Sequence, residues 1–358
     1  MQRDQNSLHH LAGKQVFVGL SGGVDSAVSA ALLQQAGAEV TGVFIKGWYP
    51  PGMPCTWADD RRDAMRAAAH LRISFRTLDA SAQYKASVID YLLREYKAGR
   101  TPNPDIMCNR EVKFGAFYRY AMAEGADYIA TGHYAQVASA DDMPRLRRGI
   151  DEAKDQSYFL WAVPKEALSK SIFPVGGMPK QEVRMLAEQF KLPNARKRDS
   201  QGICFLGTIS VEDFLRQEFG SEPGNAVDEQ GTFMGTHTGA LLHTLGERVR
   251  LEGAEAGPWY VVRKDSASNT IVVSHEHGTR NAESVQKISL TETNWLAMVE
   301  AEETVEAQYR YHGPRIAGIL NQASGTFTPA RPLSEPIASG QSLVIYRNDA
   351  CLGGGIIV

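Results

Sequence analysis

Cysteine, net charge and long apolar runs are all scarce in this chain of 358 residues. It has four cysteines, Cys55, Cys108, Cys204 and Cys351, and a formal net charge of −3. Four cysteines at these spacings are too few for a disulfide scaffold and too far apart for a metal-binding knuckle. The charge balance gives no overall attraction to nucleic acid, so RNA binding would depend on local basic patches.

The absence of long apolar runs argues against a membrane protein. No run approaches the roughly 20 residues that a spanning helix needs, and residues 1–14 are polar, without the apolar core of a signal peptide. We therefore expect a soluble, cytoplasmic protein with no membrane partner. The hydrophobic share of 43% is ordinary for a globular protein, and 358 residues exceed what one core usually organises. Two or three domains are expected.

Glycine, in contrast, is concentrated in one informative stretch, Val16 to Ser26 (VFVGLSGGVDS). Its apolar start predicts a buried strand, and the Ala- and Leu-rich residues that follow predict a helix. A strand-to-helix turn aims backbone N–H groups and a helix dipole at one point, and Gly22 and Gly23 have no Cβ to exclude a phosphate oxygen. Ser21 and Ser26 add hydroxyl donors. Asp25 could hold a metal ion or cap the helix.

This stretch is neither a Walker motif nor a Gly-x-Gly-x-x-Gly motif. SGGVDS is similar to the pyrophosphate loop (PP-loop) of the ATP pyrophosphatase superfamily, which cleaves ATP between its α- and β-phosphates. The alternative is a glycine-rich turn that only closes a βα unit.

The next hundred or so residues alternate between strand and helix patterns. This alternation predicts an α/β fold, a Rossmann-like parallel sheet with helices on both faces. Because the carboxyl ends of such strands face one crevice, Ile45 and Gly132 are expected near the nucleotide. The predicted strands are 39–46, 73–78 and 127–131, and the predicted helices are 58–71, 87–97, 111–124 and 180–192. We also predict an irregular loop at 99–109, a hairpin at 134–149 and a helical start at 154–160.

The composition of the sequence changes from about Val211. A short helix to Phe219 gives way to glycines, prolines and brief β-branched runs, so the rest of the chain is expected to be mostly β. We predict a PP-loop domain at 1–209, a small β-rich central domain at 210–284 and a C-terminal β-barrel at 285–358.

Two cysteines lie in segments suited to chemistry. Cys108 follows Asp105 by three residues, and because a nearby carboxylate would raise the thiol pKa, Asp105 is better suited to exchanging a proton with substrate. Lys197 and Arg198 precede Cys204 and can lower its pKa, which favours accepting and passing on sulfur. The alternative for Cys108 is a buried structural cysteine.

The remaining cysteines and the basic clusters are less informative. Cys55 has no charged neighbour close by, and Cys351 is expected in the core. Two basic clusters could bind RNA or could simply be solvated: Arg145, Arg147 and Arg148, and Lys191, Arg196, Lys197 and Arg198.

Six blocks, in order, resemble the bacterial tRNA-specific 2-thiouridylases, a family of the PP-loop superfamily. The likeness runs almost from end to end. The blocks are SGGVDS (21–26), GRTPNPDxxCNR (99–110), ATGHY (130–134), KDQSYFL (154–160), DSQGICF (199–205) and CLGGGII (351–357).

The resemblance implies an enzyme that adenylates the C2 oxygen of the wobble uridine (position 34) in tRNAs for Lys, Glu and Gln and replaces it with sulfur. It implies ATP, with Mg²⁺, as cofactor, a persulfide sulfur-donor protein as partner, and a monomer. Cys108 would be the nucleophile, and Cys204 would carry the persulfide. ATP would contact Gly19, Leu20, Ser21, Gly22, Gly23, Val24, Asp25, Ser26, Ile45 and Gly132. The tRNA would contact Asn103, Pro104, Asp105, Lys154, Asp155, Gln156, Tyr311 and His312, and no resident metal site is implied.

One departure from the family pattern concerns the last of these contacts. The family usually has Arg-Tyr-Arg-Gln where this chain has Arg-Tyr-His-Gly at 310–313. Two alternatives to the thiouridylase reading remain. An amide-forming PP-loop synthetase would give Cys108 and Cys204 no role, and a non-catalytic nucleotide- or RNA-binding module would need both thiols to be inert.

Overall fold

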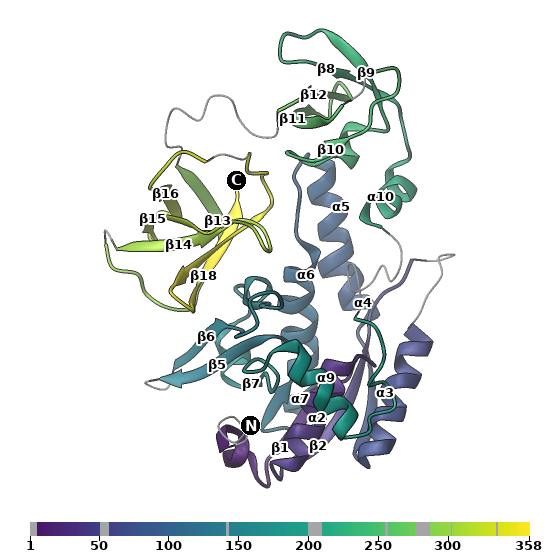
Figure 1. Cartoon of the computed structure of the whole chain (residues 1–358), viewed down its shortest axis with the longest axis vertical. Helices are drawn as coiled ribbons and strands as arrows, with labels where there is room; N and C mark the ends of the chain where they lie inside the picture. The colour runs from purple at the N-terminus through teal and green to yellow at the C-terminus, as the bar shows by residue number, and fades with distance from the viewer. Residues whose placement is uncertain are drawn as a thin grey trace.

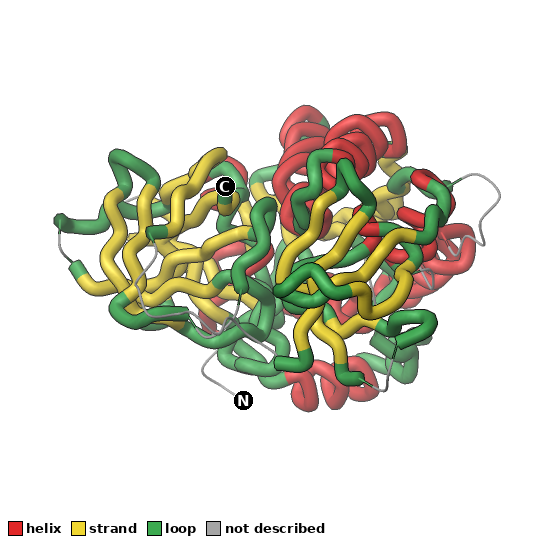
Figure 2. The backbone as a smooth tube through the Cα atoms, turned by 90° about the horizontal axis from the view of Figure 1, so that it is seen from above, coloured by secondary structure: helices red, strands yellow, loops and turns green. Residues whose placement is uncertain are grey.

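The chain folds into a helix-rich α/β body, a small β domain and a β-barrel (Figure 1). This computed structural model describes residues 6–50, 57–140, 143–199, 210–254, 257–276, 287–301, 303–333 and 336–358. Seen from above, the strands of the barrel lie to one side of the helices and of the central-domain strands (Figure 2). The predicted fold class is therefore confirmed.

The N-terminal body is built on a parallel sheet of five strands in the order β3-β2-β1-β4-β7. Because the chain order reverses between β1 and β4, their adjacent carboxyl ends form a topological switch point, where open α/β sheets bind ligands. The strands are β1 (Gln15–Gly19), β2 (Glu39–Lys46), β3 (Ser74–Asp79), β4 (Tyr128–Ala130) and β7 (Ser171–Ile172). The strands predicted from sequence are confirmed to within about two residues.

Helices cover both faces of this sheet. They begin with the 3-10 helix η1 (Asn6–Leu11), followed by α2 (Val24–Gln35) and α3 (Trp57–Leu71). A continuous helical rod is formed by α4 (Ser81–Tyr84), the π-helical turn η2 (Lys85–Ile89) and α5 (Asp90–Lys97), and two later helices are α8 (Lys165–Ser169) and α9 (Lys180–Gln189). Leu33 of α2, for example, is fully buried in one apolar cluster with Val16 of β1 and Val40 of β2.

The prediction of an irregular loop at 99–109 was wrong in its second half. A helix begins at Pro104 and continues through α6 (Pro104–Met107), the π-helical η3 (Cys108–Ala116) and α7 (Phe117–Ala123). Asn103 caps it, because its side-chain oxygen accepts hydrogen bonds from the backbone N–H groups of Asp105 and Ile106. Proline at the first helical position favours a helix start, because it has no N–H to leave unpaired and its φ is already helical.

The predicted hairpin is confirmed as β5 (Ala135–Ala140) and β6 (Met143–Arg148). The helix predicted from residue 154 was wrong, since the chain there forms a turn and then the short 3-10 helix η4 (Ser157–Phe159). The buried carboxylate of Asp155 accepts hydrogen bonds from the backbone N–H groups of Gly149 and Ser157. These bonds hold a turn rather than a helix.

The central domain follows α10 (Val211–Phe219) and contains a sheet of five strands in the order β10-β11-β12-β8-β9. It also includes the 3-10 helix η5 (Ala240–Leu242). The strands are β8 (Gly224–Val227), β9 (Phe233–His237), β10 (Arg248–Val249), β11 (Trp259–Asp265) and β12 (Thr270–Ser274).

The C-terminal strands close into a six-stranded barrel, because β13 pairs with both β16 and β18. The strands are β13 (Ile288–Trp295), β14 (Thr304–Gln308), β15 (Ile316–Asn321), β16 (Thr326–Pro329), β17 (Ser342–Arg347) and β18 (Ala350–Ile357). The hairpin strand β6 pairs with β18 at Arg147 and Ala350, so the N-terminal body contributes to the same sheet.

The barrel docks on the segment that leads into the Cys108 helix. Thr101 N–H donates to the Ser339 carbonyl at 2.8 Å, and Gln341 Nε2 donates to the Thr101 carbonyl at 2.7 Å. Gly340 fits between them with φ +89, where a Cβ would lie 3.0 Å from the Thr101 nitrogen. The barrel therefore fixes the backbone two residues before Asn103.

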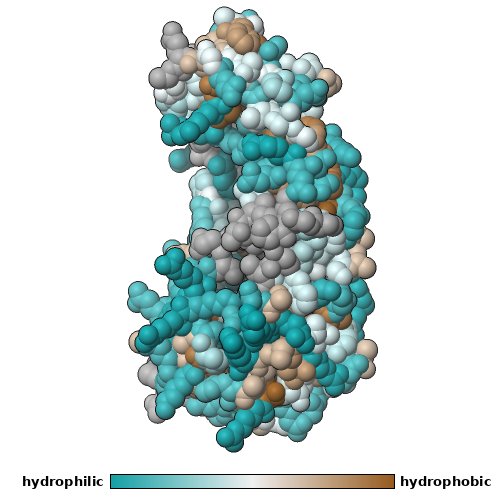
Figure 3. All heavy atoms as spheres, turned by 90° about the vertical axis from the view of Figure 1, so that its right-hand side faces the viewer, coloured by the Kyte–Doolittle hydropathy of each residue, from teal (hydrophilic) through white to brown (hydrophobic). Residues whose placement is uncertain are grey.

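The face that carries α3 and α10 is largely hydrophilic, with apolar residues in scattered patches (Figure 3). None of the helices in the described part of the chain combines the length and the hydropathy that a membrane span requires. The predicted boundaries at 209/210 and 284/285 fall at segments outside the described residues.

Candidate active site

The glycine-rich loop lies between the end of β1 and the start of α2, as its sequence predicts. Ser21 N–H donates to Ser26 Oγ at 3.2 Å, and Ser26 Oγ lies 3.2 Å from the Gly23 carbonyl, to which it donates. Gly23 N–H points to Ser21 Oγ at 3.3 Å. These bonds curl the loop around the first turn of α2, whose first N–H groups have no partner within the helix. Such a turn is a ready anion-binding site.

Two glycines allow this loop to pack between α3 and β4. Gly22 has φ +80, and a Cβ there would lie 2.3 Å from the Asp60 carbonyl oxygen. Gly132 follows β4, and a Cβ on it would lie 2.7 Å from the Ser26 nitrogen. The structure therefore brings Gly132 against the loop, as expected for two segments at the switch point. Any side chain at either position would push the loop out of place.

The residues predicted for ATP fit a triphosphate in their chemistry. Gly23 and Val24 present backbone N–H groups at the start of a 12-residue helix, and no side chain of Gly22 or Gly23 obstructs them. Leu20 is buried, and its N–H donates to the Val43 carbonyl at 2.8 Å, which fixes the entry to the loop. Ile45 is half-buried near the end of β2, the neighbouring strand.

A charge cluster adjoins the loop. Lys180 Nζ donates to Asp25 Oδ1 at 2.6 Å and Oδ2 at 2.8 Å, and it lies 3.0 Å from Asp199 Oδ1. Tyr134 donates its hydroxyl hydrogen to Asp25 Oδ1 at 2.8 Å. Burial and the charge of Asp25 raise the pKa of Tyr134. Tyr134 therefore stays protonated and acts as a donor near neutral pH.

Asp199 connects this cluster to other cations. Lys154 Nζ lies 3.1 Å from Asp199 Oδ2, and Arg184 also binds this carboxylate. Burial opposes ionisation of Asp199, but the hydrogen bonds from Lys180 and Lys154 outweigh it and lower the pKa of Asp199 to about 2. Asp199 is therefore an anion at any physiological pH. In the described part of the chain, no group of three or more His, Cys, Asp or Glu side chains could hold a metal ion.

Cys108 lies in the second turn of the helix that starts at Pro104, and it is buried. Asp105 lies three residues earlier, on the same face of the helix, and is half-buried. The wider π-helical turn begins at Cys108, a type of turn that is frequent at functional sites. The next residue, Asn109, donates from Nδ2 to the Phe159 carbonyl at 3.0 Å.

His133 completes the end of β4. Its ring is buried against Phe114 and Phe173, and its Nδ1 lies 2.7 Å from Thr131 Oγ1. Burial, together with the positive charge of Lys113, lowers the pKa of His133 well below its usual value. The ring is therefore neutral near pH 7.

The three residues predicted to contact tRNA at 154–156 differ in their surroundings. Lys154 is partly exposed and binds Asp199. Asp155 is buried and binds Arg148 at 3.2 Å. Gln156 Oε1 accepts a hydrogen bond from Tyr134 N–H at 3.0 Å. The side chains of Asp155 and Gln156 are thus already used to hold the turn.

Tyr311 and His312 extend this region from the barrel. The Tyr311 ring lies 4.5 Å from the Phe159 ring and 3.9 Å from the His312 ring, between centroids. His312 takes the left-handed conformation, with φ +56, in the turn after β14. Through Phe159 and Asn109, the structure connects these predicted tRNA contacts to the Cys108 helix.

The basic clusters are partly used within the protein. The Arg148 guanidinium lies over the Tyr346 ring, Arg147 binds Asp349, and Lys197 binds both Asp60 and Asp63 at 2.8 Å. The exposed members are Arg145, Arg147, Lys191, Arg196 and Arg198.

Of the other three cysteines, the structure describes only Cys351. Cys351 is buried, as expected, and burial raises its pKa to about 12. Cys55 and Cys204 lie outside the described residues, so their predicted roles stay predictions.

Sequence reasoning missed Lys180, Tyr134 and Asn194 as members of the site. Lys180 and Asn194 are separated from their loop partners by 155 and at least 171 positions. Tyr134 lies inside one of the recognised blocks, which was its only signal. The other two carry no local pattern that differs from an ordinary helix start or turn.

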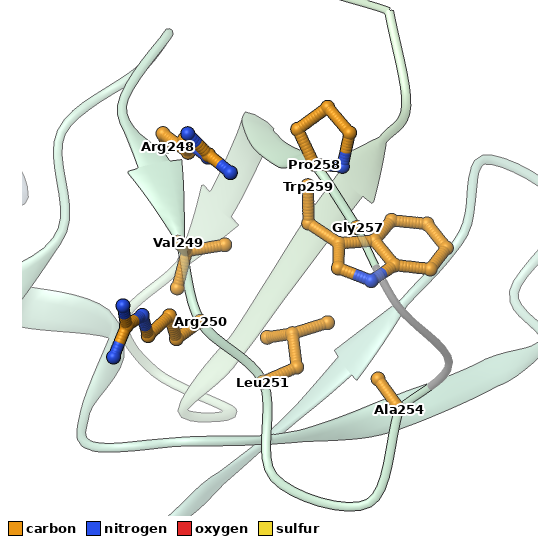
Figure 4. Close-up of a pocket in the computed structure, with 8 residues that line it drawn as sticks. All are labelled: Arg248, Val249, Arg250, Leu251, Ala254, Gly257, Pro258 and Trp259. Atoms are coloured by element: carbon orange, nitrogen blue, oxygen red, sulfur yellow. The ribbon is translucent and has the colours of Figure 1, made fainter.

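A separate hollow of about 490 Å³ lies on the central domain. Val249, Leu251 and Trp259 border it, with Arg248 at its rim (Figure 4). His275 stacks on Trp259 with 3.7 Å between ring centroids. The hollow shares no lining residue with the glycine-rich loop.

Three family models together match nearly the whole chain. They are described as a tRNA methyl transferase HUP domain (residues 14–208), a tRNA methyl transferase PRC-barrel domain (212–275) and an aminomethyltransferase beta-barrel domain (285–357). Their order matches the α/β body, the central β domain and the closing barrel.

Curated relatives match at high identity. The tRNA-specific 2-thiouridylases MnmA of Proteus mirabilis (strain HI4320) and Serratia proteamaculans (strain 568) are each 42% identical to this chain, over 96% of its length and 97% of theirs. The solved structure of the U34-tRNA thiolase NcsA from Methanococcus maripaludis is 19% identical, with a TM-score of 0.38, over 61% of this chain and 73% of that one. The curated matches confirm the resemblance noted in the sequence: the chain belongs to the family of tRNA-specific 2-thiouridylases.

Proposed function

We propose that this protein is an ATP-dependent tRNA 2-thiouridylase that replaces the C2 oxygen of the wobble uridine with sulfur. The observation that carries the proposal is the SGGVDS loop at the sheet's switch point, in a chain 42% identical to 2-thiouridylases over 96% of its length. The proposed substrates are tRNAs for Lys, Glu and Gln, and the proposed compartment is the cytoplasm.

The chemistry is a leaving-group exchange. A pyrimidine carbonyl cannot expel oxide, so the C2 oxygen first attacks the α-phosphate of ATP and releases pyrophosphate. Sulfur then adds at C2, and the original oxygen leaves with AMP. Preorganised N–H groups at the start of α2 would stabilise the charge that develops on the phosphates.

The sulfur would come from a persulfide on Cys204, loaded by a donor protein. In one route the terminal sulfur attacks C2 directly, and the Cys108 thiol then attacks Cys204 sulfur to release the thiocarbonyl. In the other, Cys108 first attacks the persulfide and frees hydrosulfide, which attacks C2. Both routes end with a Cys108–Cys204 disulfide, so each turnover requires a thiol reductant.

The remaining roles follow the same assignment. Gly19 to Ser26, Ile45 and Gly132 would bind ATP, with Asp25 able to contact an accompanying Mg²⁺. Asn103, Pro104 and Asp105 would receive the uridine, which must leave its stack to reach a buried thiol. Asp105 would exchange a proton with the base. The outer tRNA contacts would be Lys154, Asp155, Gln156, Tyr311 and His312.

We also propose the division into domains at 1–209, 210–284 and 285–358, acting as a monomer. The barrel would hold the tRNA, because Tyr311 and His312 lie on it and it docks beside Thr101. With His312 and Gly313 in place of the arginine and glutamine usual in the family, this loop offers fewer donors to RNA phosphates.

The test uses the purified full-length chain, unmodified tRNA for Lys, ATP labelled at the α-phosphate, a persulfide donor and a thiol reductant. We expect AMP release that depends on tRNA, and nucleoside mass spectrometry that detects exchange of oxygen for sulfur rather than an added methyl group. A matched transcript with cytidine at the wobble position should give neither. AMP release without thiolation would favour a different PP-loop reaction, and no AMP release would favour a binding module.

A further inference from the structure

Asn194 contacts the phosphate loop through the loop's backbone carbonyls. Its Nδ2 group donates to two loop carbonyls, those of Gly22 and Gly23, each at 3.0 Å. The residue is buried, with 6% of its surface exposed. Its Oδ1 is also buried and has no hydrogen-bond partner among the described residues. The orientation of the amide is therefore set by the two loop carbonyls alone.

Peptide geometry gives these two bonds a consequence for ligand binding. In a planar trans peptide the C=O and the N–H point in opposite directions. The carbonyls of Gly22 and Gly23 belong to the peptides that carry the N–H groups of Gly23 and Val24. When Asn194 holds both carbonyls, it turns both N–H groups away from itself. The Gly23 N–H accordingly points away from Asn194, to Ser21 Oγ at 3.3 Å. The Gly23 carbonyl also accepts hydrogen bonds from Ser26 Oγ at 3.2 Å and from Ala27 N–H at 3.4 Å.

The position of Asn194 is itself fixed by its neighbours. Lys197 N–H donates to the Asn194 carbonyl at 2.9 Å, and Lys197 Nζ binds Asp60 and Asp63 on α3. The Asp60 carbonyl is the group that a Cβ on Gly22 would meet. On the other side, the buried Leu192 packs with Val28 of α2 in one apolar cluster. The turn that carries Asn194 is thus attached to both helices that flank the loop.

Glycine makes this support necessary. Gly22 and Gly23 have more accessible backbone conformations than other residues, so their peptide planes can rotate unless something holds them. Two N–H groups that rotate freely would have to be ordered when phosphate binds, which weakens binding. Ser26 and Ala27 hold the Gly23 carbonyl, and the Asn194 amide extends this support to the Gly22 carbonyl, so that both N–H groups are ordered in advance.

We propose that Asn194 is a positioning residue for ATP, which acts by holding the peptide planes of the phosphate loop. This inference rests on the proposed function, since it assigns ATP to that loop. Asn194 is not a catalytic residue, because it contacts the loop and not the phosphates.

The test compares four variants of the full-length chain by the KM for ATP and the KM for tRNA in the AMP-release assay. Asn194→Ala removes both bonds and should raise the KM for ATP by up to about thirtyfold, since each neutral hydrogen bond contributes about 1 kcal/mol. Asn194→Asp places an acceptor against two carbonyls and should raise the KM for ATP further. Asn194→Thr keeps one donor and should give an intermediate value. The KM for tRNA should stay within about twofold of wild type in all three.

The fourth variant is the control. Gln34 Nε2 donates to the Leu71 carbonyl at 2.8 Å, which is the same kind of bond at the far end of α2. Gln34→Ala should leave the KM for ATP unchanged. Thermal melts of all variants identify loss of folding, and if Asn194→Ala does not fold, the Thr and Asp variants carry the comparison.

The outcomes separate the two proposals. If wild type releases no AMP with tRNA, the proposed function fails, whatever the variants do. If wild type is active and the folded Asn194 variants keep its KM for ATP, the role of Asn194 is refuted. A parallel rise in the KM for tRNA would also refute it, because that would indicate general damage to the site.

Discussion

Lys180 Nζ lies 2.6 and 2.8 Å from the two carboxylate oxygens of Asp25, although 155 positions separate the residues. Lys180 also contacts Asp199 at 3.0 Å, so one ammonium group stands between two carboxylates beside the phosphate loop. Without it, the Asp25 carboxylate would face an incoming triphosphate without this ion pair, while Asp199 would keep Lys154 and Arg184. The lysine therefore makes the site electrostatically compatible with ATP.

Replacing Lys180 with methionine should reduce tRNA-dependent AMP release by at least tenfold, mainly through a higher KM for ATP, because Asp25 then loses the ammonium group that pairs with it. Lys154→Met is the matched control, since Lys154 binds Asp199 at 3.1 Å but has no bond to Asp25. Its KM for ATP should change much less. Asp25→Ala, which removes the loop carboxylate, should abolish AMP release. If the two lysine variants raised the KM for ATP equally, the special role of Lys180 beside Asp25 would be contradicted.

Asp199 should contribute a pH-dependent part of the folding stability. Its pKa is lowered from the ordinary 3.8 to about 2, because the bonds from Lys180 and Lys154 outweigh the effect of burial. A lowered carboxylate pKa stabilises the fold above the unfolded-state value, and the contribution is lost as pH falls through the folded-state value. We expect Asp199 to contribute about 2 kcal/mol to the free energy of unfolding above about pH 5. This contribution should be lost progressively from about pH 4 to pH 2.

The measurement for Asp199 is urea unfolding of wild type and Asp199→Asn across that pH range. The stability difference between the two proteins should be largest near neutral pH and should shrink as pH falls below 4, on the order expected for one carboxylate. A difference that is constant with pH would contradict the ionic origin.

Gly22→Ala should inactivate the phosphate loop. The residue has φ +80, and the new Cβ would lie 2.3 Å from the Asp60 carbonyl oxygen, so the loop must move. Gly13 has a similar φ of +73 but no atom within 4 Å of an added Cβ. Gly13→Ala should therefore cost only the backbone strain, roughly 1 kcal/mol, and leave AMP release intact. Comparable losses of activity in both variants would indicate strain rather than displacement of the loop.

Cys108→Ser and Cys204→Ser should each abolish sulfur incorporation while ATP binding is retained. Cys351→Ala is the control, because Cys351 is buried in the barrel and burial raises its pKa to about 12. A thiol with that pKa is protonated at neutral pH and does not act as a nucleophile. Nucleoside mass spectrometry of tRNA treated with each variant provides the measurement. Full thiolation by either serine variant would overturn the assignment.

Asp155→Ala should lower the folding stability of the protein, in addition to any effect on tRNA binding. Asp155 binds the buried Arg148 guanidinium at 3.2 Å, and two of the nitrogens of Arg148, Nε and Nη2, are buried without a partner among the described residues. Removing the carboxylate would leave a buried, uncompensated charge, at a cost of about 3 kcal/mol.

Denaturant unfolding checks this expectation. Asp155→Ala paired with Arg148→Met should recover part of the loss, because the double variant buries no lone charge. If Asp155→Ala unfolds like wild type but weakens tRNA binding, its main role is the RNA contact that the family resemblance implies.

The local patterns of the sequence were sufficient for four strands of the parallel sheet and for the glycine-rich turn. Buried parallel strands read as continuous apolar runs, and a turn that needs φ +80 reads as glycine, so residues 16–26 predicted their own conformation. The helix that starts at Pro104 was misread, because proline and asparagine were taken as breakers. At a helix start they favour the helix, and a side-chain cap decides between the two.

What only the tertiary structure decided is how distant groups meet. Gly132 comes to the loop because the order β3-β2-β1-β4-β7 places the ends of β1 and β4 side by side. Lys180 and Asn194 come to the same loop because α9 and the turn after it pack against α2. Hydrogen bonds and ion pairs depend on atoms within a few ångströms, whereas a sequence pattern records only neighbours along the chain. The sequence thus determined the kind of site, and the packing of helices on the sheet determined which side chains hold it in shape.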